Sequence, residues 1–170
     1  MKIRHGFVSN SSSSSFVVAF PKKPETVEEM RELLFKDVQS FPAPYDDHNY
    51  PATQIAEIVL RDMGEPLTDE QAIEELVAGY WGGNYNQNRM LSGLEDRKGE
   101  WNREEWGKMY AIFDELQTND AKAVICRMHE RYPGWQLFKF SYSDNDGALP
   151  AAMEHGGLFE LLPHEQVSHH

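Results

Sequence analysis

The chain has 170 residues, of which 40% are hydrophobic, and its 28 acidic and 16 basic residues give a formal net charge of -12. This size supports one well-packed core and is short for two domains. We therefore expect a single globular domain over residues 1–170, with a Ser-rich N-terminal segment (1–15) and a flexible C-terminal tail (164–170). The negative charge repels a phosphate backbone and so disfavours general binding of nucleic acid. It suits a basic protein partner, or a surface that imitates nucleic acid.

Two features of the sequence bear on the cellular compartment. The first apolar run, Phe16–Phe20, is stopped by Pro21 and is too short for a signal-peptide core or a membrane span. The single cysteine, Cys126, cannot form a disulfide within the chain, which agrees with a reducing compartment. We expect a cytoplasmic protein that has no membrane segment, in which Cys126 is structural and not a nucleophile.

Apolar residues recur with helical spacing in five segments, and three of these open with a capping box. The capping boxes are Thr26–Glu29, Thr68–Gln71 and Asn102–Glu105. The predicted helices cover about residues 26–36, 51–63, 68–80, 102–116 and 119–131. Their aromatic and methionine stripes, including Tyr110 and Leu116, are expected to face the core. Residues 40–50 contain two prolines and predict a loop.

Three segments have the composition of strands. Phe16–Phe20 is uninterrupted and apolar, Trp135–Ser143 places aromatic residues on alternate positions, and Leu158–Leu162 is an apolar run that ends at Pro163. Asp144–Gly147 predicts a turn between the last two. The sequence therefore predicts an α+β fold, with a small three-stranded, mostly antiparallel sheet packed with about five helices. The N-terminal strand and a C-terminal hairpin would form this sheet.

The segment Gly79–Arg89, between the third and fourth predicted helices, is rich in glycine, asparagine and aromatic residues. Glycine allows a ligand to approach the backbone closely, and Asn and Gln side chains both donate and accept hydrogen bonds. Trp81 and Tyr85 are therefore candidate binding residues. The alternative is a plain connection between helices, in which both aromatic side chains pack beneath the loop.

Carboxylates and imidazoles gather towards the C-terminus. The candidate catalytic residues are Asp144, Asp146, Glu154 and His155, and the candidate metal ligands are Asp144, Asp146 and His155. Such side chains can bind a divalent metal or pair a general acid with a base. His164 would lie roughly 30 Å from His155 on a continuous strand, at about 3.3 Å per residue, unless Gly156–Gly157 bends the chain. The alternative is structural, because Asp-Asn-Asp-Gly is also an ordinary turn and lacks the distal Glu of a calcium loop.

Five consecutive serines, the serine tract Ser11–Ser15, precede the first predicted strand. A loop of serines offers hydroxyl and amide groups that can surround an anion, and sites where phosphorylation can add charge. The candidate binding residues in this region are Arg4, Ser9, Asn10, Ser11, Ser12, Ser13, Ser14 and Ser15. The alternative is a flexible polar segment that binds no ligand.

Residues 4–18 resemble an N-terminal signature of uncharacterised bacterial and bacteriophage proteins. The signature has the form R-x-G-F-V-S-N-S-S-S-S-S-F followed by apolar residues, and here it reads RHGFVSNSSSSSFVV. The resemblance covers about a tenth of the chain. It implies a small intracellular protein of bacterial or phage type, and it brings no activity and no catalytic residue with it.

Two classes of function follow from these patterns. The first is a small acidic binding or regulatory protein that acts through protein–protein contacts. The second is a metal-dependent hydrolase or nucleotide-handling enzyme, in which the C-terminal cluster binds a divalent metal and the serine tract holds phosphate. The enzyme requires both regions within about 10 Å across one pocket. Because the sequence has no nucleophile elbow, phosphate-binding loop, dinucleotide fingerprint or zinc-binding cysteine pair, we expect the binding class.

Overall fold

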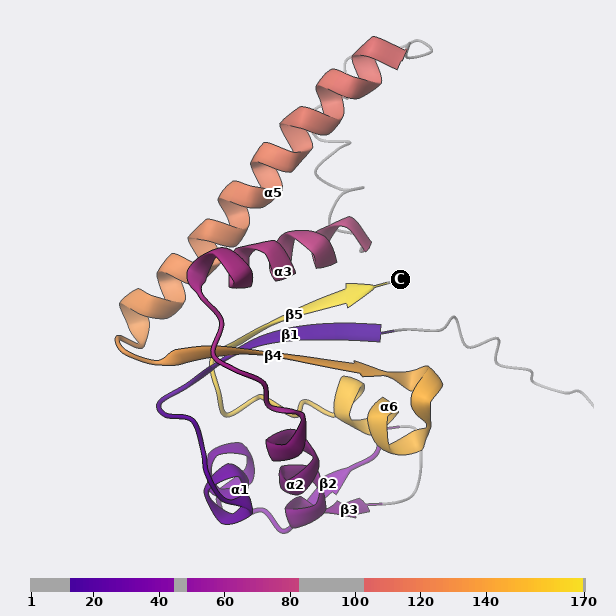
Figure 1. The fold of residues 1–170 in the computed structure, drawn as a ribbon. Coiled ribbons are helices and arrows are strands. Elements are labelled where there is room, and N and C mark those ends of the chain that lie inside the picture. Colours follow the sequence, from indigo (N-terminus) through magenta and orange to yellow (C-terminus); the bar gives the residue numbers. More distant parts are fainter. Residues whose placement is uncertain (1–12, 45–48, 83–102, 170) are drawn as a thin grey trace, which may run out of the picture.

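The computed structural model describes residues 13–44, 49–82 and 103–169, and it has the expected α+β fold (Figure 1). The α-helices are α1 (Val27–Phe35), α2 (Ala52–Asp62), α3 (Asp69–Gly82), α5 (Arg103–Arg131) and α6 (Ala148–His155). The strands are β1 (Ser13–Phe20), β2 (Ser40–Pro42), β3 (Asn49–Pro51), β4 (Gln136–Ser143) and β5 (His164–His169). A short 3-10 helix, η1 (Asp144–Asp146), connects β4 to α6.

Strand β1 is the middle strand of a three-stranded antiparallel sheet with the order β4-β1-β5. Phe16 of β1 is level with Phe140 on one side and with Gln166 on the other. The two C-terminal strands therefore both pair with β1 and not with each other, so the predicted C-terminal hairpin is wrong. The short strands β2 and β3 form a separate antiparallel pair.

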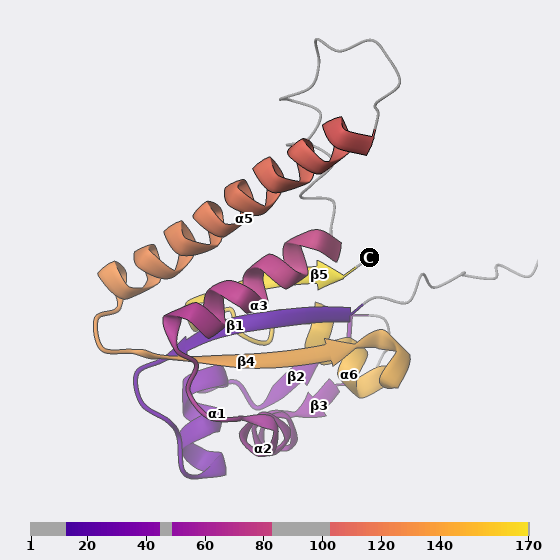
Figure 2. The ribbon, with the colours of Figure 1, turned by 45° about the horizontal axis from the view of Figure 1, so that its top comes forward.

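Helices cover both faces of the sheet (Figures 1 and 2). Phe16, Val18 and Phe20 of β1 belong to the core formed with α1, α2 and α6, whereas Val17 and Ala19 belong to the core formed with α3 and α5. Successive side chains of a strand point to opposite faces, so a strand buried on both faces needs apolar residues at every position. The position of β1 in a sheet that helices cover on both faces therefore explains its uninterrupted apolar run.

Two of the three predicted capping boxes begin at described residues, Thr26 and Thr68, and in both the threonine caps its helix; the third begins at Asn102, outside the described residues. Thr26 Oγ1 accepts a hydrogen bond from the N–H of Glu29 at 3.2 Å, and Thr68 Oγ1 accepts one from the N–H of Gln71 at 3.3 Å. In return, the N–H of Thr68 donates to Gln71 Oε1 at 2.9 Å. These bonds satisfy amide groups that the first turn of a helix leaves without partners, and they fix where α1 and α3 begin.

Residues 103–131 form one helix, α5, where the sequence predicted two helices with a break near residue 117. The residues at the expected break are Gln117 and Thr118, and neither is a glycine or a proline that would interrupt the hydrogen-bond ladder. Gln117 is buried and so lies within the packed part of the helix. None of the helices in the described segments combines the length and the apolar character that crossing a bilayer requires.

The C-terminal third differs from the sequence prediction in two places. Leu158–Leu162, expected as a strand, forms turns after α6, and residues 164–169, expected as a tail, form β5. Leu158 and Phe159 are nevertheless fully buried. The short apolar run Leu158–Leu162 therefore predicted buried residues correctly, but it could not distinguish a strand from turns whose side chains are buried.

Residues 40–50 were expected to be a loop and instead contain β2 and the first part of β3. Pro42 and Pro51 are the last residues of these two strands. A proline at the end of a short strand removes no N–H from the interior of the ladder, so the pair can form despite its prolines.

Helix α3 packs directly on β5 through Gly79. A Cβ atom added at Gly79 would overlap the side chain of Val167 on β5, whose branched Cβ has little rotameric freedom. Gly107 in α5 provides a matched comparison, because an added Cβ there meets nothing within 4 Å. Close approach of the helix to the strand therefore requires glycine at position 79 and not at position 107.

We predict that Gly79→Ala lowers the free energy of unfolding by about 1–3 kcal/mol, the usual cost of overpacking. Gly107→Ala should leave it unchanged or raise it by up to about 1 kcal/mol, because alanine favours the helix. Chemical denaturation followed by circular dichroism measures both variants. Equal effects at the two positions would show that α3 does not approach β5 as closely as described.

Candidate functional site

The carboxylate of Glu154 in α6 is buried, with 2% of the residue exposed. Ser14 Oγ of β1 donates a hydrogen bond to Glu154 Oε1 at 3.0 Å, and the backbone N–H of Asp144 donates to Glu154 Oε2 at 2.9 Å. His155 Nε2 lies 3.5 Å from Glu154 Oε2. The serine tract and the C-terminal cluster are therefore in direct contact, which is the juxtaposition that the enzyme hypothesis requires.

Gln166 of β5 joins the same network. Its Nε2 donates to Ser14 Oγ at 3.2 Å and to the backbone oxygen of Glu154 at 3.3 Å. The network thus connects β1, β5, α6 and the junction between β4 and η1. A buried charge is tolerated only when hydrogen bonds satisfy it, and both Ser14 and Glu154 are satisfied from within the fold. We conclude that these two residues form a structural connection, because their groups are committed to each other and closed off from solvent.

The two candidate aspartates are placed differently. Asp144 contributes its backbone N–H to the network, and Asp146 is exposed on η1. Within residues 13–44, 49–82 and 103–169, no three His, Cys, Asp or Glu side chains lie close enough together to hold a metal ion. The donor set expected for a divalent metal is therefore not assembled in this part of the chain.

The serine tract is a strand from Ser13 onward, and not the loop that the sequence predicted. Ser14 faces α6, and Ser15 Oγ lies on the other face of the sheet, 3.1 Å from Ser141 Oγ of β4. Trp81 falls within the last turn of α3, so residues 79–82 of the predicted loop are helical, and the rest of that predicted loop lies outside the described residues. The remaining candidate binding residues lie outside the described residues: Arg4, Ser9, Asn10, Ser11, Ser12 and Tyr85.

A surface pocket of about 500 Å³, the Glu154 pocket, opens beside this network. Its lining residues are Pro42, Pro44, Glu154, His155, Gly156, Gly157, Glu160, His164 and Gln166. The chain bends at Gly156–Gly157, where Gly157 has a φ of 71°, and this bend brings His155 and His164 to one pocket. Sequence reasoning missed Glu160 and Gln166, because neither belongs to a motif and only the fold places them here.

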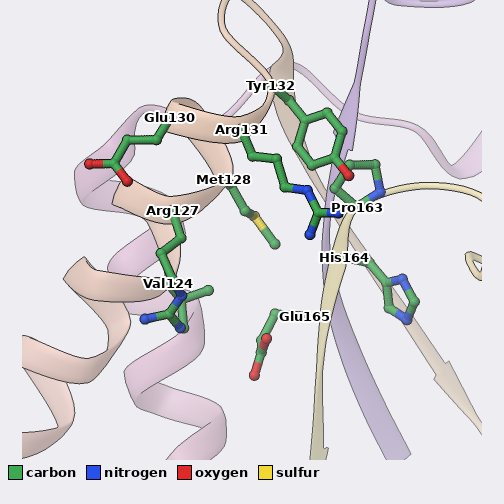
Figure 3. A pocket seen from close by; sticks show the side chains of 9 residues that line it. All are labelled: Val124, Arg127, Met128, Glu130, Arg131, Tyr132, Pro163, His164 and Glu165. Atoms are coloured by element: carbon green, nitrogen blue, oxygen red, sulfur yellow. The ribbon is translucent and has the colours of Figure 1, made fainter.

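A second pocket, of about 510 Å³, lies between the last turns of α5 and the start of β5 (Figure 3). Arg127 and Arg131 of α5 line it, and Glu165 extends from β5 into the space between the two elements. Burial raises the pKa of Glu165, although the charge of Arg127 partly opposes this rise. Burial also raises the pKa of Tyr80 in α3 to about 12, and the charge of Glu165 adds to it.

The first half of α5 carries exposed apolar side chains. Tyr110 is 46% exposed, Ile112 58% and Leu116 41%. Figures 1 and 2 show that this half extends away from the sheet, whereas the inner face of the second half packs against α3. The expectation that Tyr110 and Leu116 face the core is therefore wrong. The sequence signal that was missed is Ile112, an apolar residue outside the predicted stripe.

Comparison with known proteins adds no relatives to this account. No family model matches the chain, and neither a curated protein nor a solved structure gives a significant match.

We predict that Glu165→Gln stabilises the fold at neutral pH. A carboxyl group whose folded pKa is raised favours folding only while it is protonated, so its contribution is lost as the pH rises from its ordinary value of 4.5 through the raised value. The stability advantage of the variant should therefore grow from pH 4 to pH 7. Urea unfolding across this range measures it, with Glu130→Gln, at an exposed position on α5, as the control. An advantage that is independent of pH would contradict the prediction.

Proposed function

We propose that this chain is a small acidic binding or regulatory protein that engages another protein through the first half of α5. The observation that carries the proposal is the exposure of Tyr110, Ile112 and Leu116 on a helix that leaves the body of the molecule. Ile112 and Leu116 are four positions apart and therefore share one side of the helix, and exposed apolar residues that lie together mark contact surfaces. A partner that covers these side chains would remove their apolar surface from water.

The charges on the first half of α5 and on the whole chain indicate what kind of partner would bind there. Exposed Asp114 and Glu115 accompany Lys108 on this part of α5, and the whole chain carries a formal charge of -12. A negative surface speeds association with a positive one and selects against acidic competitors. The proposed partner therefore presents an apolar, helix-forming segment flanked by lysine or arginine.

The proposed compartment is the cytoplasm of a bacterial or phage-infected cell, as the N-terminal signature and the single cysteine suggest. Cys126 is exposed on α5, and its hydrogen bond to Glu130 raises the pKa of the thiol. A raised pKa lowers the fraction of thiolate, which is the reactive form of cysteine. A thiol-dependent enzyme is thereby disfavoured.

The alternative function, a metal-dependent hydrolase or nucleotide-handling enzyme, draws its support from the contact between Ser14 and Glu154. Burial weighs against it, because Ser14 is 1% exposed and Glu154 is 2% exposed. A substrate could reach these groups only if α6 moved away from the sheet. The exposed half of α5 needs no such rearrangement, so we prefer the binding function.

We predict that the protein binds a labelled amphipathic peptide of leucine and lysine and does not bind a matched peptide of leucine and glutamate. The double variant Ile112→Ser, Leu116→Ser should weaken this binding by about tenfold or more, because it removes two aliphatic contacts. Fluorescence anisotropy measures the affinities. The matched control is Leu161→Ser, which changes another exposed leucine, 50% exposed and located before β5.

Equal affinity for both peptides, or an equal loss of binding in the Leu161→Ser control, would contradict the proposed surface. Light scattering adds a separate check on the occupant. A dimer that Ile112→Ser, Leu116→Ser dissociates would show that a second copy of the chain covers α5, and it would overturn the proposal of a different partner.

A further inference from the structure

The Glu154 pocket differs in charge from the pocket at the end of α5. Its described lining residues include the exposed carboxylate of Glu160 and contain no lysine or arginine, whereas Arg127 and Arg131 line the other pocket. The carboxylate of Glu154 is buried behind the wall, where Ser14 and the N–H of Asp144 hold it. A hollow with one carboxylate at its surface, a second behind its wall and no lysine or arginine among its described lining residues has a negative potential, and its walls concentrate that potential. The pocket therefore favours a positively charged ligand.

His164 contributes a hydrogen-bond acceptor to this pocket. Its Nδ1 lies 3.0 Å from the carbonyl oxygen of Leu162, and because a carbonyl can only accept, Nδ1 carries the hydrogen and donates. In the neutral ring, Nε2 is then an acceptor. The ring is also positioned by packing, with its centroid 6.5 Å from that of Phe16 and 6.2 Å from that of Phe159. The acceptor nitrogen thus has a defined location.

Gln166 contributes a second acceptor by the same reasoning. Its Nε2 faces the carbonyl oxygen of Glu154, which can only accept, so the orientation of the amide group is fixed. Both contacts that Nε2 makes, to Glu154 and to Ser14, are within the fold. The amide oxygen is the polar atom that Gln166 can offer to a ligand.

Glu160 contributes the negative charge on the solvent side of the pocket. Its N–H donates to the carbonyl oxygen of Gly157 at 3.2 Å, which closes the turn after α6. Its side chain folds back over Gly157, where an added Cβ would overlap the carboxylate. Gly157 also has a positive φ that other residues rarely adopt. The turn therefore places the exposed carboxylate of Glu160 at the pocket.

We propose that the Glu154 pocket binds a guanidinium or alkylammonium group. Glu160 would form charge-assisted hydrogen bonds with its N–H donors, and the acceptors of His164 and Gln166 would receive others. Pro42 and Pro44 offer apolar surface to the attached alkyl chain. The group can belong to a free small molecule or to an arginine or lysine side chain of a protein. This inference is independent of the proposed role of α5, which packs on the other face of the sheet.

The test compares n-butylguanidinium with n-butylurea, which has a similar shape and no charge, by isothermal titration calorimetry at neutral pH. We expect saturable binding of n-butylguanidinium, and binding of n-butylurea at least about tenfold weaker. Glu160→Gln should weaken binding of the cation by about tenfold, and Glu130→Gln, outside this pocket, should leave it unchanged. Thermal unfolding of both variants verifies that they fold.

A second arm distinguishes the sources of the cation. A capped Gly-Arg-Gly peptide that binds at least as tightly as n-butylguanidinium would identify a protein side chain, and exclusion of the peptide would identify a free small molecule. Three results would overturn the proposal: equal binding of n-butylurea, unchanged affinity in Glu160→Gln, or tighter binding of inorganic phosphate than of the cation.

Discussion

Glu154 of α6 is the residue through which β1, β5 and the junction between β4 and η1 are joined, and its carboxylate is buried. Burying a carboxylate costs several kcal/mol unless hydrogen bonds compensate for the lost water. The hydroxyl of Ser14 and the N–H of Asp144 provide that compensation, and Gln166 binds to both Ser14 and Glu154. Any arrangement that separated α6 from β1 would leave the carboxylate buried and unsatisfied, so this network constrains the path of the chain after β4.

The same constraint determines where function can be located. Because the side chains of Ser14 and Glu154 are buried and hydrogen-bonded to each other, the serine tract and the C-terminal cluster are poorly suited to form a reactive centre. The surfaces that remain available are the exposed half of α5, with Ile112 and Leu116, and the pocket in front of the network. Both are suited to binding, and they lie on opposite faces of the sheet.

The sequence predicted those elements whose signal lies within a few consecutive residues. The capping boxes at Thr26 and Thr68 reflect hydrogen bonds between residues three apart. The apolar run of β1 reflects its burial on both faces. The sequence missed β5, because an edge strand in which Val167 is the one buried residue among residues 164–167 has no strong pattern. The sequence indicated that Glu154 and the serine tract could belong to one site, but whether they are in contact depends on strand order. Strand order arises from packing across the whole chain, which no local pattern encodes.

The most direct test of the contact between Ser14 and Glu154 is a double-mutant cycle on Ser14→Ala and Glu154→Ala, measured by urea unfolding. We expect a coupling energy of about 1–3 kcal/mol, because each substitution removes one partner of a buried, charge-assisted hydrogen bond. The neutral pair Ser15 and Ser141, which joins β1 to β4 on the other face, is the control and should couple more weakly. Effects of Ser14→Ala and Glu154→Ala that add to within about 0.5 kcal/mol would contradict the central role of this contact.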